Sequence, residues 1–451
     1  MLQVKVGPGG VRGIVDQGLD LGLLVDLTGA FATWVDGGPV LVARDTRPSS
    51  PMLAHAVFSA LCAAGCEVLD AGICPTGAAQ AEAARQGAAG AISVTASHND
   101  ASWNGLKLFG EAGRVLSSAE GKEILDLWHQ GEYRRMPFDK LGAVRDLEDV
   151  AERYVAALLE HIDQDVVARA GLRVVVDACN GAGAMVLPEL FRQLRVELIP
   201  LSCEPTGQFP HPPDPTAANM AQVAAIVPPV GAQVGFGLSS DCERVSLVTD
   251  SGDALGTPAT LPLVMEEELS RPDVAGGTVV ASIASDSRVD RVAERHGARV
   301  VRSGVGVQAV MEQIDLEGAV VGGEGSGGVA ISRVQLAFDG LAVLVRLLER
   351  VARDSGTGPM ASALPAVHLR SAEVPSPVGA GYATVARIRA RATGRVTDLD
   401  GVRVDVDGGW YYVRVSHTEP VVRILCEEQS ASRADERIRA LRRQVRAGVQ
   451  E

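Results

Sequence analysis

Short runs of valine, isoleucine and alanine alternate with helix-length segments along most of this 451-residue chain. An apolar run of four to eight residues between polar or glycine-rich stretches is typical of a strand in a mostly parallel sheet, whose faces the intervening helices cover. The pattern therefore predicts an α/β protein. The runs that show it most clearly are residues 40–45, 91–96, 173–178, 278–284 and 319–323.

Helix boundaries are readable at several points between these strands. Ser50 and Pro51 supply a cap and a first-turn proline for a helix that should end at Gly65. A second helix should begin at Asp286 or Ser287 and end at Gly297. Residues 146–162 place apolar side chains on one helical face, which predicts a long amphipathic helix leading out of a first domain.

The chain length suggests about three domains at roughly 150 residues each, with four plausible. Small residues and proline become frequent after residue 353, as in linkers. Beyond them an alternating pattern with a turn at Asp407-Gly408 predicts an antiparallel hairpin, and residues 433–447 predict a terminal helix. We expect three similar mixed α/β domains and a smaller C-terminal α+β domain, over residues 1–145, 146–250, 251–355 and 365–451.

Composition narrows the classes of function. A net charge of −14 and a pI of about 5.1 argue against a protein that binds nucleic acid or an anionic membrane. The N-terminus lacks an apolar signal core, and no run of about 18 apolar residues is present. The seven cysteines form no CxxC pair and are odd in number, which indicates reduced, mostly buried thiols. We expect a cytoplasmic protein.

Polar loops follow several predicted strands, and in open parallel sheets ligands bind beyond the carboxyl ends of strands. After residues 91–96 come Ser97 and His98, with Lys107 ten positions on. A hydroxyl, an imidazole and an amine together suit transfer of a phosphoryl group, which needs a nucleophilic oxygen, charge neutralisation and a proton carrier. A helix cap with an exposed lysine is the alternative.

A second loop alternates Ser239, Asp241 and Glu243, so an extended backbone would point all three side chains to one side. Hard oxygen ligands at this spacing suit Mg²⁺. A solvated turn is the alternative.

Three further loops offer anion and sugar contacts. Glu324 and Ser326 lie among glycines, where a carboxylate and a hydroxyl suit sugar hydroxyls, although a plain flexible loop is equally consistent. Arg12 lies in the glycine-rich segment 7–13 and adds another anion contact. The last loop contains Arg414, Ser416, His417 and Thr418. A guanidinium with two hydroxyls suits the binding of a phosphate, and a strand-end turn is the alternative.

Taken in order, these loops resemble those of the α-D-phosphohexomutase superfamily, which includes phosphoglucomutases, phosphomannomutases and phosphoglucosamine mutases. TASHNDASWNGLK here corresponds to the family's TASHNPxxxNGxK, and SSDCER to DGDxDR. GEGSGG corresponds to GExSGH, and RVSHTEP to RxSGTEP. The segments GVRG, ARDTRPSS and CEPTGQFPHPPDPT are also similar, so the resemblance covers nearly the whole chain.

The resemblance implies a mechanism and a set of roles. Phospho-Ser97 would donate its phosphoryl group to a hexose phosphate, and the hexose bisphosphate so formed would return its other phosphate to Ser97, moving phosphate between O1 and O6. The domains would surround a central cleft, and the protein would be a monomer or a homodimer. Mg²⁺ would be held by Ser97, Ser239, Asp241 and Glu243. Lys107 and His98 would carry protons, and Arg12 and Arg244 would stabilise charge. Glu324 and Ser326 would bind sugar hydroxyls, and Arg414, Ser416, His417 and Thr418 the distal phosphate.

Several positions depart from the family pattern, and most of them lie in the loops to which the resemblance assigns catalysis and binding. Ser239 replaces an aspartate of the metal loop, and Glu243 is one methylene longer than the usual aspartate. An acid and a base usual near residues 304–308 are missing. The other departures are Ser240 for glycine, Gly9 for aspartate, Asp100 for proline and Gly328 for histidine. The alternatives are therefore a catalytically impaired homologue that binds phosphosugars or regulates, and a mutase with an altered metal site or an unusual sugar.

Overall fold

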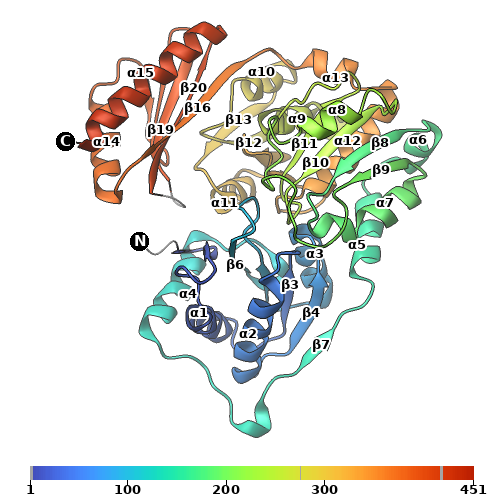
Figure 1. Cartoon of the computed structure of the whole chain (residues 1–451), viewed down its shortest axis with the longest axis vertical. Coiled ribbons are helices and arrows are strands. Elements are labelled where there is room, and N and C mark those ends of the chain that lie inside the picture. The colour runs from blue at the N-terminus through green and yellow to red at the C-terminus, as the bar shows by residue number, and fades with distance from the viewer. Residues whose placement is uncertain (1–3, 275, 417–419, 451) are drawn as a thin grey trace.

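The computed structural model describes residues 4–274, 276–416 and 420–450, and within them the strands form four sheets flanked by helices (Figure 1). The architecture is three mixed α/β domains followed by a C-terminal domain, as the alternation of strands and helices predicts.

The first domain is built on a seven-stranded sheet in the order β1-β2-β6-β5-β3-β4-β7. The central β3 pairs in parallel with β4 and β5, and β6 runs antiparallel to β5. The strands are β1 (Val4–Gly7), β2 (Gly10–Ile14), β3 (Val40–Arg44), β4 (Val68–Ile73), β5 (Gly90–Val94), β6 (Trp103–Phe109) and β7 (Val144–Asp146). The α-helices are α1 (Leu21–Trp34), α2 (Ser50–Ala63), α3 (Thr76–Gln86) and α4 (Ser118–Gln130).

The second and third domains each have a four-stranded sheet of the same design, in the orders β11-β10-β8-β9 and β15-β14-β12-β13. The second contains α5 (Val150–Leu159), α6 (Gln164–Arg169), β8 (Arg173–Asp177), α7 (Leu187–Leu194), β9 (Glu197–Leu201), α8 (Ala221–Ile226), β10 (Val234–Leu238) and β11 (Val245–Thr249). The third contains α9 (Thr260–Leu269), β12 (Thr278–Ser282), α10 (Arg288–Arg295), β13 (Arg299–Ser303), α11 (Val307–Glu317), β14 (Val321–Gly323), β15 (Val329–Ile331) and α12 (Gly340–Asp354).

The three domains repeat one arrangement that matters for function. In each, a strand with a parallel neighbour leads into a loop and returns as its antiparallel partner: β5 to β6, β10 to β11 and β14 to β15. Ser97, Asp241 and Glu324 lie in these three equivalent loops. Topology thus assigns the same position in each domain to a predicted functional residue.

The fourth domain follows the short helix α13 (Gly358–Ala363), and its five strands are ordered β16-β20-β19-β18-β17. Val406 pairs with Gly409 across the predicted turn, which confirms the hairpin. The elements are β16 (His368–Pro375), α14 (Val378–Ala390), β17 (Arg395–Thr397), β18 (Val402–Val406), β19 (Gly409–Val415), β20 (Val421–Glu428) and α15 (Ala431–Gln450).

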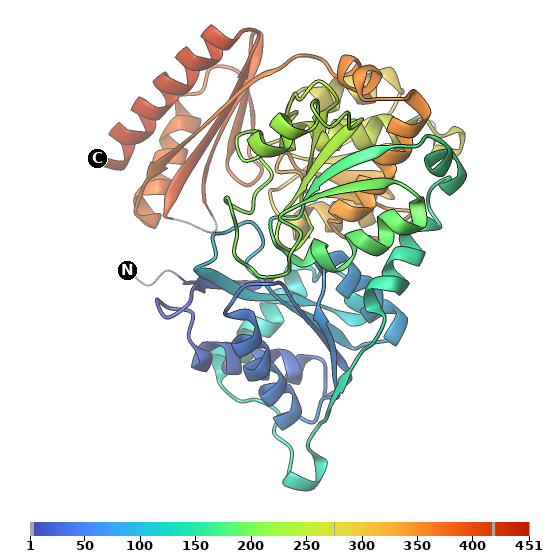
Figure 2. The same cartoon turned by 45° about the vertical axis from the view of Figure 1, so that its right-hand side comes forward.

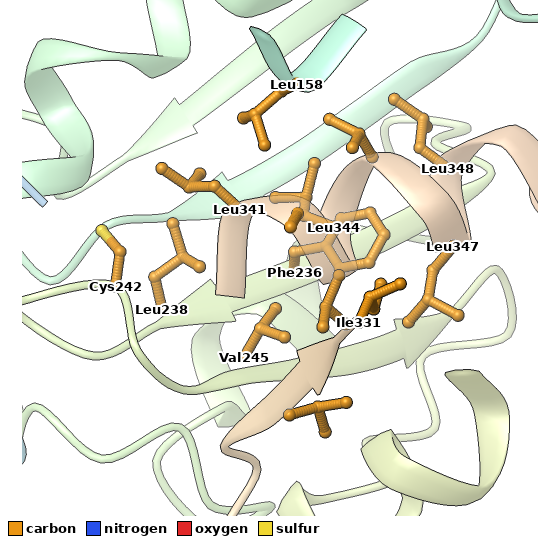
Figure 3. Close-up of a cluster of buried hydrophobic side chains, with 14 of the residues drawn as sticks. Leu158, Phe236, Leu238, Cys242, Val245, Ile331, Leu341, Leu344, Leu347 and Leu348 are labelled. Carbon is orange, nitrogen blue, oxygen red and sulfur yellow. The ribbon is translucent and has the colours of Figure 1, made fainter. Parts of the chain in front are cut away.

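One hydrophobic cluster runs through the first three domains, whereas the fourth has a core of its own. Figure 3 shows Phe236 and Val245 of the second domain packed with Leu344 of α12 in the third. The fourth domain instead meets the third through a small cluster around Ile283 and Trp410. The first three domains therefore form one body, and in both views the fourth domain (red) lies to one side of it (Figures 1 and 2).

Most local predictions agree with the structure, and one helix differs. The predicted helix over residues 146–162 is shorter, because Val144–Asp146 pairs with β4 as the edge strand β7 and Asp149 has a left-handed backbone with φ 55°. All seven cysteines are free, and five are buried. Among the described residues no helix is both long enough and apolar enough to span a bilayer. The domain boundaries and the cytoplasmic location stay predictions.

Candidate active site

A cleft of about 640 Å³ opens where the first three domains meet. It contains side chains from all three equivalent loops, although these loops are far apart in the sequence. The predicted site residues that line it are Arg12, Ser97, His98, Lys107, Glu243, Arg244, Glu324 and Ser326.

Ser97 lies just beyond β5 with its hydroxyl turned toward the second domain. Its Oγ donates to Asp241 Oδ1 at 3.1 Å, and its backbone N–H donates to Thr95 Oγ1. Its φ of 52° is uncommon for a residue with a side chain, and such backbone conformations cluster at functional sites. The side chain is held at a sharp turn rather than on a relaxed surface loop.

A buried arginine that the sequence interpretation assigned no role fastens this loop. Arg47 is fully buried, and its Nε donates to Asp45 at 2.9 Å. Its two terminal nitrogens donate to the backbone carbonyls of Ser97, Asn99, Asp100 and Trp103. Both charged residues lie in the segment ARDTRPSS, whose similarity to the family was the only signal available in the sequence.

The extended backbone predicted for the metal loop was wrong, whereas its role as a metal site stays a prediction. Residues 239–242 form a tight turn, with the Cys242 N–H donating to Ser239 O at 2.9 Å and Cys242 at φ 61°, so the three side chains do not alternate along an extended strand. Ser239 Oγ instead donates to Asp241 Oδ1 at 2.8 Å and accepts from the Arg244 N–H. Ser239 and Asp241 are buried behind Ser97.

Lys107 joins the two carboxylates of this loop. Its Nζ lies 2.6 Å from Asp241 Oδ2 and 2.6 Å from Glu243 Oε2. Burial alone would raise the pKa of Asp241, but the charge and hydrogen bond of Lys107 hold that pKa below its ordinary value. Burial raises the pKa of Glu243, and the opposing charge of Lys107 does not offset this effect.

Other cations surround the hydroxyl of Ser97. Arg12 donates to Asn99 Oδ1 at 3.0 Å, and Arg244 is held by Asp214 Oδ1 at 3.0 Å. Burial, and then the positive charges of these two arginines and of Lys107, lower the pKa of His98 well below its usual value, so its imidazole is neutral at neutral pH. The buried Nδ1 of His98 has no hydrogen-bond partner among the described residues.

In the third domain, Glu324 and Ser326 face the cleft as a pair. Glu324 Oε2 accepts from Ser326 Oγ at 2.9 Å, and Oε1 accepts from the Gly306 N–H. This pair lines the same cleft as Ser97.

Two departures from the family pattern face each other across the domain boundary. A Cβ on Gly9 would come within 3.7 Å of the Gln308 side chain. Gly9, which replaces an aspartate of the family, therefore lies next to the segment 304–308, which lacks the family's acid and base. Gln308 donates instead to Leu116 O at 3.1 Å. Similarly, a Cβ on Gly328 would meet the Phe338 ring at 2.5 Å, and Phe338 lines the cleft.

The described residues of the fourth domain are not among those lining this cleft. Arg414 and Ser416 are buried, Arg414 lies 3.5 Å from Asp400, and the Ser416 carbonyl accepts from Lys5, which does line it. His417 and Thr418 fall outside the described residues.

Comparison with known proteins gives matches along the whole chain. The four family models described as phosphoglucomutase/phosphomannomutase domains I, II, III and C-terminal match residues 3–135, 152–252, 259–366 and 373–444. A phosphoglucomutase/phosphomannomutase of Thermococcus kodakarensis is 31% identical over 95% of this chain and 96% of its own length. A probable phosphoglucosamine mutase of Methanopyrus kandleri is 32% identical over 95% of both chains.

Solved structures agree. A phosphoglucomutase/phosphomannomutase family protein of Burkholderia thailandensis superposes with a TM-score of 0.85 at 29% identity, covering 98% of this chain and 97% of that one. An N-acetylphosphoglucosamine mutase variant of Aspergillus fumigatus, solved with glucose 1,6-bisphosphate, has a TM-score of 0.62 over 99% of this chain and 96% of its own. At 14% identity that second likeness shows the fold alone.

Proposed function

Since this chain belongs to the phosphoglucomutase/phosphomannomutase family of phosphohexomutases, we propose that it moves a phosphoryl group between O1 and O6 of a hexose phosphate. Phospho-Ser97 is the donor, and a hexose bisphosphate is the intermediate. The observation that carries the proposal is the Ser97 hydroxyl, which lines a cleft of about 640 Å³ within hydrogen-bond distance of Asp241 and next to three cationic side chains.

In the forward step, the P–Oγ bond of phospho-Ser97 breaks as a sugar hydroxyl oxygen bonds to phosphorus. The proton of that hydroxyl passes to the neutral imidazole of His98, and Oγ takes a proton from the Lys107 ammonium. When the bisphosphate returns its other phosphate to Ser97, both protons travel back. Lys107 and His98 are thus restored in each full cycle, and no external proton donor is consumed.

The charge of the transferring group is balanced by the cleft. Arg12 and Arg244 face it from the first and second domains and stabilise negative charge that spreads over the phosphoryl oxygens. Glu324 and Ser326 bind the sugar hydroxyls. In the fourth domain, Arg414 and Ser416, with His417 and Thr418, bind the phosphate that does not react.

The residues present fit a divalent cation. Asp241 and Glu243 turn carboxylate oxygens to one point, at present that of the Lys107 ammonium, and hard oxygen donors are the ligands that Mg²⁺ prefers. No cluster of three or more acidic, histidine or cysteine side chains that could hold a metal occurs in the described part of the chain. We propose that phospho-Ser97 and the hydroxyl of Ser239 complete the set. Bound there, Mg²⁺ would neutralise charge on the phosphoserine oxygens.

The names of the relatives support a substrate class. They are a phosphoglucomutase/phosphomannomutase and a probable phosphoglucosamine mutase. We propose a hexose phosphate and its bisphosphate as the ligands of this chain. Glucose, mannose and glucosamine phosphates are the candidates, because a carboxylate and a hydroxyl contact features that all three sugars share.

The first test combines mass and turnover. Intact mass should show one added phosphate on the purified protein, and a coupled assay with glucose, mannose and glucosamine 1-phosphates in Mg²⁺ should show turnover. Ser97→Ala should abolish both, while the matched control Ser102→Ala, at an exposed position of the same loop, should abolish neither. An unphosphorylated protein that turns over none of the sugars at high Mg²⁺ would leave only the phosphosugar-binding or regulatory alternative.

A further inference from the structure

We propose that Lys107 is an exchangeable counter-ion of the acidic pair Asp241 and Glu243: its ammonium neutralises them when no divalent cation is bound and is released into the cleft when one binds. The proposal rests on the proposed function, because the cation concerned is the one expected at that site. It assigns to this lysine a control over metal entry in addition to its part in proton transfer.

The first argument is position. Lys107 extends from β6, and its ammonium lies at the one point from which both carboxylates are reached, 2.6 Å from each. Its side chain is 16% exposed and lines the cleft beside Ser97. A lysine stem has four rotatable carbons, so the charged end can leave the pair without any movement of the strand.

The second argument is the way the donors are divided between the two oxygens of Asp241. Its Oδ1 already accepts from Ser97 Oγ, Ser239 Oγ and the Glu243 N–H, at 3.1, 2.8 and 3.4 Å, which is one donor more than its two lone pairs. Its Oδ2 accepts from Lys107 at 2.6 Å. A cation that binds Asp241 and Glu243 through the two oxygens that Lys107 now joins must therefore take the place of the ammonium.

The third argument is charge. Two carboxylates and one ammonium leave the group with a net charge of −1, from −2 and +1. A third acid at position 239 would add one more negative charge, which one lysine could not neutralise, but Ser239 is neutral. Because residue 239 is a neutral serine, Lys107 alone neutralises one of the two negative charges of Asp241 and Glu243. A divalent cation must therefore compete with Lys107 for these two carboxylates.

The exchange can be followed at Lys107 itself, because the chain has only four lysines: Lys5, Lys107, Lys122 and Lys140. The unphosphorylated full-length protein is treated briefly with acetic anhydride, with and without Mn²⁺, and acetylation is measured for each lysine peptide by mass spectrometry. We expect Mn²⁺ to increase the acetylation rate of Lys107 at least fivefold. The exposed Lys122 and Lys140 serve as internal controls and should not change.

Binding of Mn²⁺ is measured in parallel by electron paramagnetic resonance. Lys107→Met should bind Mn²⁺ at least tenfold more tightly than the wild type, and Asp241→Asn should abolish both binding and the change in labelling. Mn²⁺ binding that leaves the acetylation of Lys107 unchanged would overturn the proposal, as would equal affinities for wild type and Lys107→Met. Loss of the proposed function is read separately, from the phosphate on Ser97 and from sugar turnover.

Discussion

At the scale of single residues, position 239 sets the amount of negative charge behind Ser97. Its hydroxyl already contacts Asp241 Oδ1 at 2.8 Å, so an aspartate there would add a full charge next to the acidic pair. Unit charges about 4 Å apart interact by about 4 kcal/mol at an effective dielectric constant near 20. Part of that energy is offset by repulsion among the carboxylates themselves.

Ser239→Asp should therefore bind Mg²⁺ at least about tenfold more tightly, which corresponds to about 1.4 kcal/mol. Isothermal titration calorimetry would measure it. Ser251→Asp, which adds the same charge at an exposed position of the same domain, is the control and should bind as the wild type does. Unchanged affinity in Ser239→Asp would mean that this turn is not the metal site.

His98 predicts the pH dependence. Its pKa lies well below the ordinary histidine value of about 6.5, so the neutral base should persist below that pH and the acid limb of kcat/KM should fall there. His98→Gln should lose this limb and lower the rate by about 10²-fold. An acid limb at pH 6.5 or above, or one retained in the variant, would exclude His98 as the base.

The same shift has a consequence for stability. A histidine whose folded-state pKa is lowered takes up protons more readily in the unfolded chain. His98 should therefore reduce the free energy of unfolding as pH falls below about 6.5, and it should have no effect above that pH.

At the scale of elements, the turn between β5 and β6 depends on one buried ion pair. Arg47 is fully buried and holds Asp45 and the carbonyls of the serine loop. Removing one partner of such a pair leaves a buried charge uncompensated, at a cost of about 3–5 kcal/mol.

Arg47→Met should lower the free energy of unfolding by about that amount in denaturant titrations. It should also speed amide hydrogen exchange around residue 97. The more exposed pair between Arg44 and Asp70 is the comparison, and Arg44→Met should cost only about 1 kcal/mol. Equal losses in the two variants would contradict the role given to Arg47.

Another element-scale contact ties the 203–216 segment to the end of β8. His211 lies 2.9 Å from Asp177 through Nε2 and 2.9 Å from Pro212 O through Nδ1. Hydrogen bonds to Asp177 and then to Cys179 raise the pKa of His211 to about 11. Because the folded-state pKa is raised, this stabilisation is complete below the unfolded value near 6.5 and is lost as pH rises toward 11.

His211→Asn should accordingly destabilise the protein by about 2 kcal/mol at pH 6, a typical figure for a hydrogen bond to a charged group. The difference from wild type should shrink as pH rises. Thermal unfolding of both proteins between pH 6 and pH 10 would measure it. A difference that is independent of pH would show that the imidazolium charge contributes nothing.

At the scale of the whole molecule, the hydrophobic core of the fourth domain is separate from that of the other three, so the fourth domain is the part that we expect to move. The first three domains share one hydrophobic cluster, while the fourth is attached through a few side chains. Arg403 stacks on Trp410 at 4.0 Å and donates to the carbonyls of Ile283 and Ser285 in the third domain. We expect the fourth domain to close over bound substrate by moving at this contact.

Small-angle X-ray scattering should show a smaller radius of gyration with glucose 1,6-bisphosphate than without it. Arg403→Ala should enlarge the radius of the free protein, because the fourth domain loses two hydrogen bonds to the third domain. Arg395→Ala, at an exposed position of the same domain, is the control. A radius unaffected by ligand would contradict a closing motion.

The sequence by itself determined the local elements and indicated the loops that we propose as functional. Strand and helix periodicity, the turn at Asp407-Gly408 and the motif around Ser97 depend on residues a few positions apart, so they are legible along the chain. The predicted strands at residues 40–45 and 173–178 agree with β3 and β8 for that reason.

Only the tertiary structure decided how those loops meet. The tight turn at residues 239–242, the burial of Arg47 beneath Ser97 and the facing pair of Gly9 and Gln308 have no local signature. Lys107 and Asp241 are 134 residues apart, and their ion pair exists because two equivalent hairpins of different domains are pressed together by a shared core. Which charges neutralise one another is a property of that packing, since a charge responds to whatever lies within a few ångströms of it.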